Sequence, residues 1–175
     1  MESLESSSSN YLQQITLTAL FTALVTISTM IIKVPTVATQ GYINVGDAMV
    51  FIAAMLGGPR KGFIAGGVGS ALADILSGYA AWAPWTLVIK AVEGLIVGVF
   101  GSDSYKRKKS LAVKEITVMG AAALWMVLGY YVAGGIMKGF SVSLIEIPAN
   151  IIQAVGSLII AIPILMALKK TKLPK

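Results

Sequence analysis

The chain has 175 residues, of which 56% are hydrophobic and only 13% are charged. Such a surplus of apolar surface needs lipid as its solvent, which indicates an integral membrane protein. The sequence contains no cysteine and no histidine, and this excludes disulfides, thiol and imidazole catalysis and the usual transition-metal ligands. The formal net charge of +6 comes from basic clusters between apolar segments and does not point to nucleic acid. We therefore expect no enzyme, no cofactor and no metal site.

The two ends of the chain are polar. Residues 1–10 carry Glu2 and Glu5, whereas a secretory signal begins with a basic segment followed by a short apolar one. We interpret residues 1–10 as a disordered cytoplasmic tail. A single transmembrane domain is expected over residues 11–170, followed by a basic cytoplasmic tail at 171–175.

Six apolar segments follow one another along the chain, and each is a candidate transmembrane helix. They cover residues 12–32, 45–57, 62–77, 84–100, 116–137 and 145–168. With the N-terminus in the cytoplasm, eleven basic residues fall on the inner side and only Lys33 and Lys138 fall outside. The inner residues are Arg60, Lys61, Lys106, Arg107, Lys108, Lys109, Lys114, Lys169, Lys170, Lys172 and Lys175. Because basic residues in short loops are retained in the cytoplasm, the pattern predicts an all-α bundle of six crossing helices with both termini cytoplasmic.

The connection between the first two segments, residues 33–47, is too polar to cross a membrane and too apolar for an ordinary solvated loop. Pro35, Gly41 and Gly46 interrupt it. This composition predicts an extended or hairpin-like cap over the outer end of the bundle.

The second and third segments are short and are separated only by residues 57–62, a tight turn in which Pro59 is expected to end a helix. The third segment is dense in glycine and alanine. Small residues let membrane helices approach closely, so we expect this helix at the centre of the bundle.

Each charged or polar side chain inside the apolar segments calls for a structural or functional explanation, because a charge at the centre of a membrane costs about 2.5–3.5 kcal/mol on insertion scales. The candidates are Asp47, Asp74, Lys90, Glu93, Tyr130, Tyr131, Glu146, Asn150 and Gln153. At about 1.5 Å per residue, all of them lie within roughly 12 Å of the outer boundary. The inner halves of the same helices are almost purely apolar, which favours a pocket open to one side over a conducting pore. Trp82 and Trp85, in the aromatic loop above, are placed to close such a pocket by stacking on a flat ring.

A structural alternative remains open. In it, Lys90 neutralises Glu93 or Asp74, while Asn150 and Gln153 join helices by hydrogen bonds. The common depth of the whole set favours the pocket.

The first segment contains Ala19-Leu20-Phe21-Thr22-Ala23, a small residue repeated after four positions. This spacing alone is a weak signal. It becomes more specific for one family in a protein of this length with six crossings and an outer cap. The chain resembles, over essentially its whole length, the substrate-binding S components of energy-coupling factor (ECF) vitamin transporters. The stretches INVGDAMVFIAAMLGGP and GSALADILSGYAAWAPWTLVIKAVEG resemble the branch for hydroxymethylpyrimidine or pyridoxine uptake.

The resemblance implies a mechanism. An S component captures its vitamin from outside, in a pocket built by the first outer loop and the outer halves of the fourth to sixth helices. It then associates with a transmembrane coupling subunit and two cytoplasmic ATPases, and it hydrolyses nothing itself. The face of Ala19 and Ala23 would dock on the coupling subunit, and Asn150 matches in place an asparagine that contacts the ligand. Several relatives also use histidine in the pocket, and this chain has none. The implied location is the bacterial cytoplasmic membrane.

The ligand expected on these grounds is small, flat and weakly charged, with ring nitrogens and hydroxymethyl groups paired to Lys90, Glu93 and Asn150. Pyridoxine and hydroxymethylpyrimidine suit this chemistry. The alternatives are an S component for another vitamin such as riboflavin, a proton-coupled secondary carrier with Asp74, Lys90 and Glu93 as a relay, and a purely structural membrane protein. No internal repeat is evident, which counts against the carrier.

Overall fold

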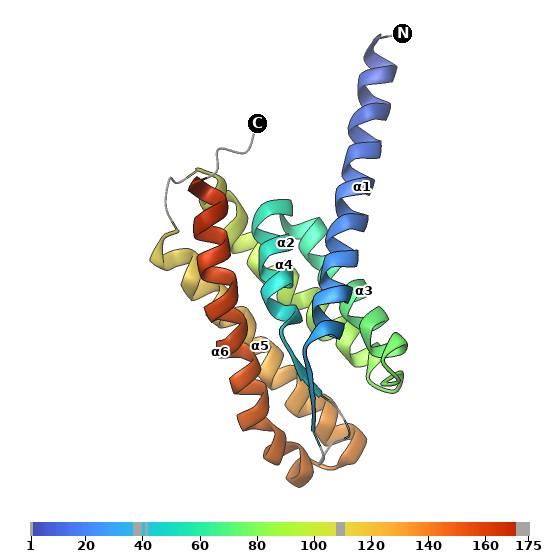
Figure 1. The fold of residues 1–175 in the computed structure, drawn as a ribbon, viewed down its shortest axis with the longest axis vertical. Coiled ribbons are helices and arrows are strands. Elements are labelled where there is room, and N and C mark those ends of the chain that lie inside the picture. Colours follow the sequence, from blue (N-terminus) through green and yellow to red (C-terminus); the bar gives the residue numbers. More distant parts are fainter. Residues whose placement is uncertain (1, 37–39, 41, 108–110, 171–175) are drawn as a thin grey trace.

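The computed structural model describes residues 2–36, 40, 42–107 and 111–170. In this part of the chain, six helices and one two-stranded hairpin form the fold (Figure 1). The helices are α1 (Glu2–Ile31), α2 (Gly46–Gly57), α3 (Pro59–Leu76), α4 (Ala83–Arg107), α5 (Val113–Lys138) and α6 (Phe140–Lys170). The prediction of an all-α six-helix bundle is confirmed.

Four helices are long and apolar enough to cross a membrane, namely α4, α5, α6 and the Tyr11–Ile31 part of α1. The helix α2 has only 12 residues, which reach about 18 Å of the roughly 30 Å of hydrocarbon. It packs against α1, α3, α4 and α6, and Val50, Phe51 and Met55 are fully buried. Neighbouring helices therefore shield this short helix from lipid.

The helix α1 begins at Glu2, so the structure differs from the disordered tail that we expected over residues 1–10. No glycine or proline lies between Glu2 and Ile31, and without a helix breaker the apolar span continues upstream as helix. The basic tail at 171–175, and Lys108 and Lys109, lie outside the described residues.

The α2–α3 turn corrects one expectation. Pro59 does not end α2 but occupies the start of α3, where a missing N–H costs nothing because the first helical N–H groups have no intrahelical partner. The chain reverses direction at Gly58, whose φ of +82° is a left-handed conformation that glycine tolerates.

The helix α3 packs against α1, α2 and α4, as expected of a central helix. Its glycines permit a close approach to α4, because a Cβ atom built on Gly66 would lie 2.5 Å from the carbonyl oxygen of Lys90. A Cβ atom on Gly67 would lie 2.9 Å from the carbonyl oxygen of Leu87. These contacts press the middle of α4 against the core and fix where the side chain of Lys90 begins.

The cap between α1 and α2 is an antiparallel hairpin of β1 (Lys33–Pro35) and β2 (Tyr42–Asn44), with Lys33 opposite Asn44 and Pro35 opposite Tyr42. It extends toward the end of the bundle that also holds the α5–α6 turn (Figure 1). The start of α1 and the end of α6 lie at the opposite end (Figure 1). The hairpin-like cap is thus confirmed, whereas which end faces the cytoplasm stays a prediction.

Candidate ligand-binding pocket

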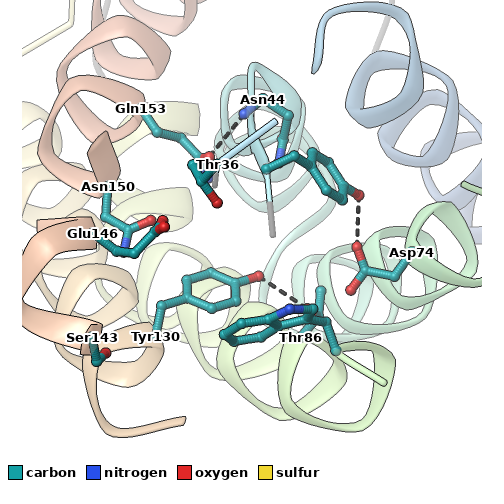
Figure 2. Close-up of a pocket in the computed structure, with 11 residues that line it drawn as sticks. Thr36, Asn44, Asp74, Thr86, Tyr130, Ser143, Glu146, Asn150 and Gln153 are labelled. Atoms are coloured by element: carbon teal, nitrogen blue, oxygen red, sulfur yellow. Dashed lines mark hydrogen bonds between the residues drawn. The ribbon is translucent and has the colours of Figure 1, made fainter. Parts of the chain in front are cut away.

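A pocket lies at the hairpin end of the bundle, where the hairpin, α3, α4, α5 and α6 come together (Figure 2). The space between its walls is about 480 Å³, including the part open to solvent. The lining residues are Thr36, Tyr42, Asn44, Asp74, Trp82, Thr86, Tyr130, Ser143, Glu146, Asn150 and Gln153.

The hairpin supplies one wall. Side chains alternate between the two faces of a strand, so Tyr42 and Asn44 both face the pocket while Ile43 between them does not. The Tyr42 hydroxyl donates a hydrogen bond of 2.6 Å to Oδ1 of Asp74 at the end of α3. Burial, together with the neighbouring Asp74 carboxylate, raises the pKa of the Tyr42 phenol well above its ordinary value. Tyr42 therefore remains a neutral hydrogen-bond donor and holds the hairpin on α3.

Aromatic rings and a threonine form the base. The Tyr130 hydroxyl donates to Oγ1 of Thr86 at 3.1 Å. The ring of Trp82 meets Tyr130 edge to face, with 6.0 Å between the ring centroids. This geometry gives a favourable aromatic contact and leaves flat apolar surface against which a ring can lie.

The first turns of α6 supply the remaining wall. Ser143, Glu146, Asn150 and Gln153 are spaced by three or four residues, which places them on one face of the helix. Glu146 and Asn150 lie across the pocket from Asp74 (Figure 2). The Ser143 hydroxyl donates to the carbonyl oxygen of Tyr131 at 2.7 Å, which ties α6 to α5.

Two polar atoms of the lining have no hydrogen-bond partner among the described residues. They are Oδ2 of Asp74 and Oγ1 of Thr36, and both are buried. A buried polar group left unsatisfied costs about 1–3 kcal/mol. A ligand that pairs with these atoms recovers that free energy, so they mark the pocket as a binding site.

Beside the pocket lies a second polar cluster, which we call the ion network: Asp47, Lys90, Glu93 and Gln153. The Lys90 ammonium donates to Oδ1 of Asp47 and, at 2.8 Å, to Oε2 of Glu93. The Gln153 amide donates to Oδ2 of Asp47 at 3.1 Å and accepts the backbone N–H of Asn44 at 2.8 Å. The three charged side chains are at most 1% exposed. The network thus ties α2, α4, α6 and the hairpin together.

The structure brings six of the eleven residues predicted for the pocket to its lining: Asp74, Trp82, Tyr130, Glu146, Asn150 and Gln153. Asp47, Lys90 and Glu93 do not line it, because they are buried and bonded to one another. The pairing of Lys90 and Glu93 with a ligand stays a prediction. Among the described residues, Lys90 forms ion pairs with Asp47 and Glu93, while Oδ1 of Asp74 accepts the Tyr42 hydroxyl.

Two predicted aromatic residues also lie outside the lining. Trp85 is half-buried and packs against the hydrophobic core. Tyr131 packs on Phe140, with 5.7 Å between ring centroids. Tyr131 is the residue next to Tyr130 on α5, so its side chain leaves the helix in a different direction and does not face the pocket.

Five lining residues were not among those predicted for the pocket: Thr36, Tyr42, Asn44, Thr86 and Ser143. Signals for some of them were present. Strand alternation joins Tyr42 to Asn44, and Ser143, Glu146 and Asn150 share the helical spacing of Gln153. No such pattern marks Thr36 or Thr86. Over the described ranges, no group of three or more acidic, histidine or cysteine side chains could hold a metal ion.

The chain was compared with known proteins. The family model for the ECF-type riboflavin transporter, S component, matches residues 9–170. An uncharacterized protein of Pyrococcus woesei is 45% identical over 138 residues, which cover 78% of this chain and 88% of that protein. The thiamine precursor transporter HmpT of Lactococcus lactis subsp. cremoris is 26% identical over 151 residues, which cover 86% of this chain and 84% of that protein. A UPF0397 protein of Streptococcus agalactiae is 27% identical over 128 residues, 70% of each chain.

Proposed function

We propose that this chain, which belongs to the family of ECF-type riboflavin transporter S components, captures hydroxymethylpyrimidine or pyridoxine and delivers it through an ATP-driven import complex. Members of this family are membrane-embedded substrate-binding subunits of transporters and not hydrolases. The identity of the ligand and its delivery to a coupling subunit with two cytoplasmic ATPases are the parts that we propose.

One observation carries the proposal: a small pocket at one end of the bundle combines flat aromatic surface with buried polar atoms that lack partners. Trp82 and Tyr130 provide the surface, and Oδ2 of Asp74 and Oγ1 of Thr36 are the unpartnered atoms. A single heteroaromatic ring with polar substituents fits both features. The similarity to a thiamine precursor transporter supports a pyrimidine among such rings.

Riboflavin is the second candidate, because the family description names it. Its three fused rings and sugar-alcohol chain need more room than one ring does. The similarity to a thiamine precursor transporter favours the smaller ligand.

Isothermal titration of the purified protein with hydroxymethylpyrimidine, pyridoxine, thiamine and riboflavin tests the ligand. We expect binding below micromolar for hydroxymethylpyrimidine or pyridoxine. Tight binding of riboflavin with neither small ring bound would overturn the proposed ligand and leave the family membership intact.

The proposed docking face for the coupling subunit is the exposed surface of α1 that contains Ala19 and Ala23. These alanines line an open groove between α1 and α3 together with Thr22 and Thr26. The Thr26 hydroxyl donates to the carbonyl oxygen of Gly69 at 2.9 Å, and this hydrogen bond ties α1 to α3 at the groove. A surface of small side chains lets another helix approach closely.

Replacement of both residues, Ala19→Leu and Ala23→Leu, tests docking. We expect uptake in cells to be lost while ligand binding to the isolated protein stays unchanged, since the groove lies apart from the pocket lining. The matched control is Ala121→Leu, at an exposed position of α5, which should retain uptake. Equal loss of binding and uptake in the double variant would show that these alanines support the bundle and not a partner.

A further inference from the structure

We infer that the pocket selects an amino-substituted heteroaromatic ring, whose N–H group donates to Oδ2 of Asp74, and that it rejects the phosphate ester of the same ring. The inference rests on the proposed function, because it takes the pocket as the ligand site. It goes beyond that function by assigning the residue that determines specificity and by separating aminopyrimidines from other small rings.

The first step is the state of the Asp74 carboxylate. The side chain is only 4% exposed. Its Oδ1 accepts the Tyr42 hydroxyl at 2.6 Å, which fixes the orientation of the carboxylate plane. The Thr86 hydroxyl lies close to this carboxylate, but within the described part of the chain no donor makes a hydrogen bond of good geometry to Oδ2. The structure thus presents one oriented, unpaired acceptor at the pocket wall.

The second step is the charge of the lining. Asp74 and Glu146 are its two carboxylates, and the eleven lining residues include no lysine or arginine. The nearby lysines pair with residues outside the lining. Lys90 is bonded to Asp47 and Glu93, and the Lys33 ammonium donates to Ser77 at 2.7 Å. A ligand that brings hydrogen-bond donors or shares positive charge is favoured here, and a ligand that brings negative charge is repelled.

The third step is the chemistry of the ring. An amino group conjugated to a basic ring nitrogen offers N–H donors with partial positive charge, which suits an ionised acceptor better than a neutral one. Asn150 lies across the pocket from Asp74 (Figure 2), and its amide can both donate to a ring nitrogen and accept from a hydroxymethyl group. A phosphate on that hydroxymethyl group would add negative charge to a lining that holds two carboxylates and no lysine or arginine.

The test compares three probes on the wild-type protein by isothermal titration: hydroxymethylpyrimidine, its analogue with methyl in place of the amino group, and its phosphate ester. The methyl group has nearly the shape of the amino group and lacks its N–H donors. We expect the amino compound to bind roughly 10- to 150-fold more tightly than the methyl analogue, the range for a hydrogen bond to a charged group. The phosphate ester should bind more weakly still.

The variant Asp74→Asn keeps an acceptor for Tyr42 and removes the charge. It should bind the amino and methyl compounds with nearly equal affinity. The matched control, Asp103→Asn, changes an exposed aspartate near the other end of α4 and should keep the full preference. Because the comparison of probes on the wild-type protein needs no variant, a poorly folded Asp74→Asn protein leaves the central comparison intact.

The outcomes separate this inference from the proposed function. Equal binding of the amino and methyl compounds, or tighter binding of pyridoxine than of both, would overturn the inference while the proposed vitamin capture stands. Tight binding of the phosphate ester would overturn the charge argument. If no small ring binds the wild-type protein, both the proposed ligand and this inference are wrong.

Discussion

Two polar clusters lie side by side at the hairpin end of the bundle, and they differ in how the protein completes them. The ion network contains its own cation, Lys90, between two carboxylates. The pocket lining has two carboxylates and no cation. Each cluster holds one carboxylate oxygen without a hydrogen-bond partner in the described structure, Oδ2 of Asp74 and Oε1 of Glu93. The sequence predicts the same depth for both clusters, so depth marks a residue as important and does not reveal its task. The groups with which a residue pairs reveal its task.

The largest effect is expected from Lys90→Met, which leaves Asp47 and Glu93 buried without their cation. Removal of one partner of a buried ion pair costs about 3–5 kcal/mol, because an uncompensated charge remains. Thermal unfolding in detergent should show a clearly lower midpoint than the parent.

Two comparisons sharpen that result. Lys138→Met is the control, since Lys138 is exposed and has a single long contact of 3.5 Å to Gln40; its midpoint should match the parent. The double variant Lys90→Met with Asp47→Asn should regain part of the lost stability, because one of the buried charges left without a cation is removed. An unchanged midpoint for Lys90→Met would contradict the structural role of the network.

An intermediate effect is expected from Gln153→Ala, because Gln153 belongs to both clusters. The variant loses the hydrogen bonds to Asp47 and to the backbone N–H of Asn44. Stranding these buried groups should cost about 1–3 kcal/mol of stability, and the loosened hairpin should also weaken ligand binding.

Unfolding and titration on the same Gln153→Ala sample check this expectation. The control is Gln13→Ala, at an exposed position of α1, which should change neither property. A change in only one of the two properties would show that the clusters are independent.

The smallest effect is expected from Thr36→Val, which removes the unpartnered hydroxyl and keeps the side-chain shape. Ligand affinity should fall by about 1 kcal/mol, roughly five-fold, while the unfolding midpoint of the unliganded protein should not fall, since the hydroxyl removed has no partner there. Thr117→Val is the control, since the Thr117 hydroxyl is exposed and donates to a carbonyl of its own helix at 3.0 Å. Unaltered affinity in Thr36→Val would remove Thr36 from the site.

The sequence predicted the fold well because its strongest signals are local. Apolar segments and the basic residues between them indicate the helices, and Pro35 with Gly46 marks the ends of the cap. The start of α1, the role of Pro59, the end of α4 and the start of α6 differed. All four concern helix ends, where the choice between helix and turn depends on one or two residues.

The site was predicted in part because its assembly depends on distant contacts. Asp47 pairs with Lys90 43 positions further along the chain, and spacing within a helix cannot reveal such a partner. Lys90 points into the network because Gly66 lets α3 press on its backbone. Tyr42 lies within the predicted cap, and its hydroxyl acquires a role only when the hairpin folds onto Asp74.

The most direct test measures ligand affinity and thermal unfolding together for two variants that each neutralise one carboxylate, Asp74→Asn and Glu93→Gln. We expect Asp74→Asn to lose affinity for hydroxymethylpyrimidine by roughly 10- to 150-fold and to unfold near the parent midpoint. Glu93→Gln, whose carboxylate is bonded to Lys90, should unfold at a lower temperature and keep its affinity. If Glu93→Gln loses as much affinity as Asp74→Asn, the ligand contacts the ion network, and the division between the two clusters is wrong.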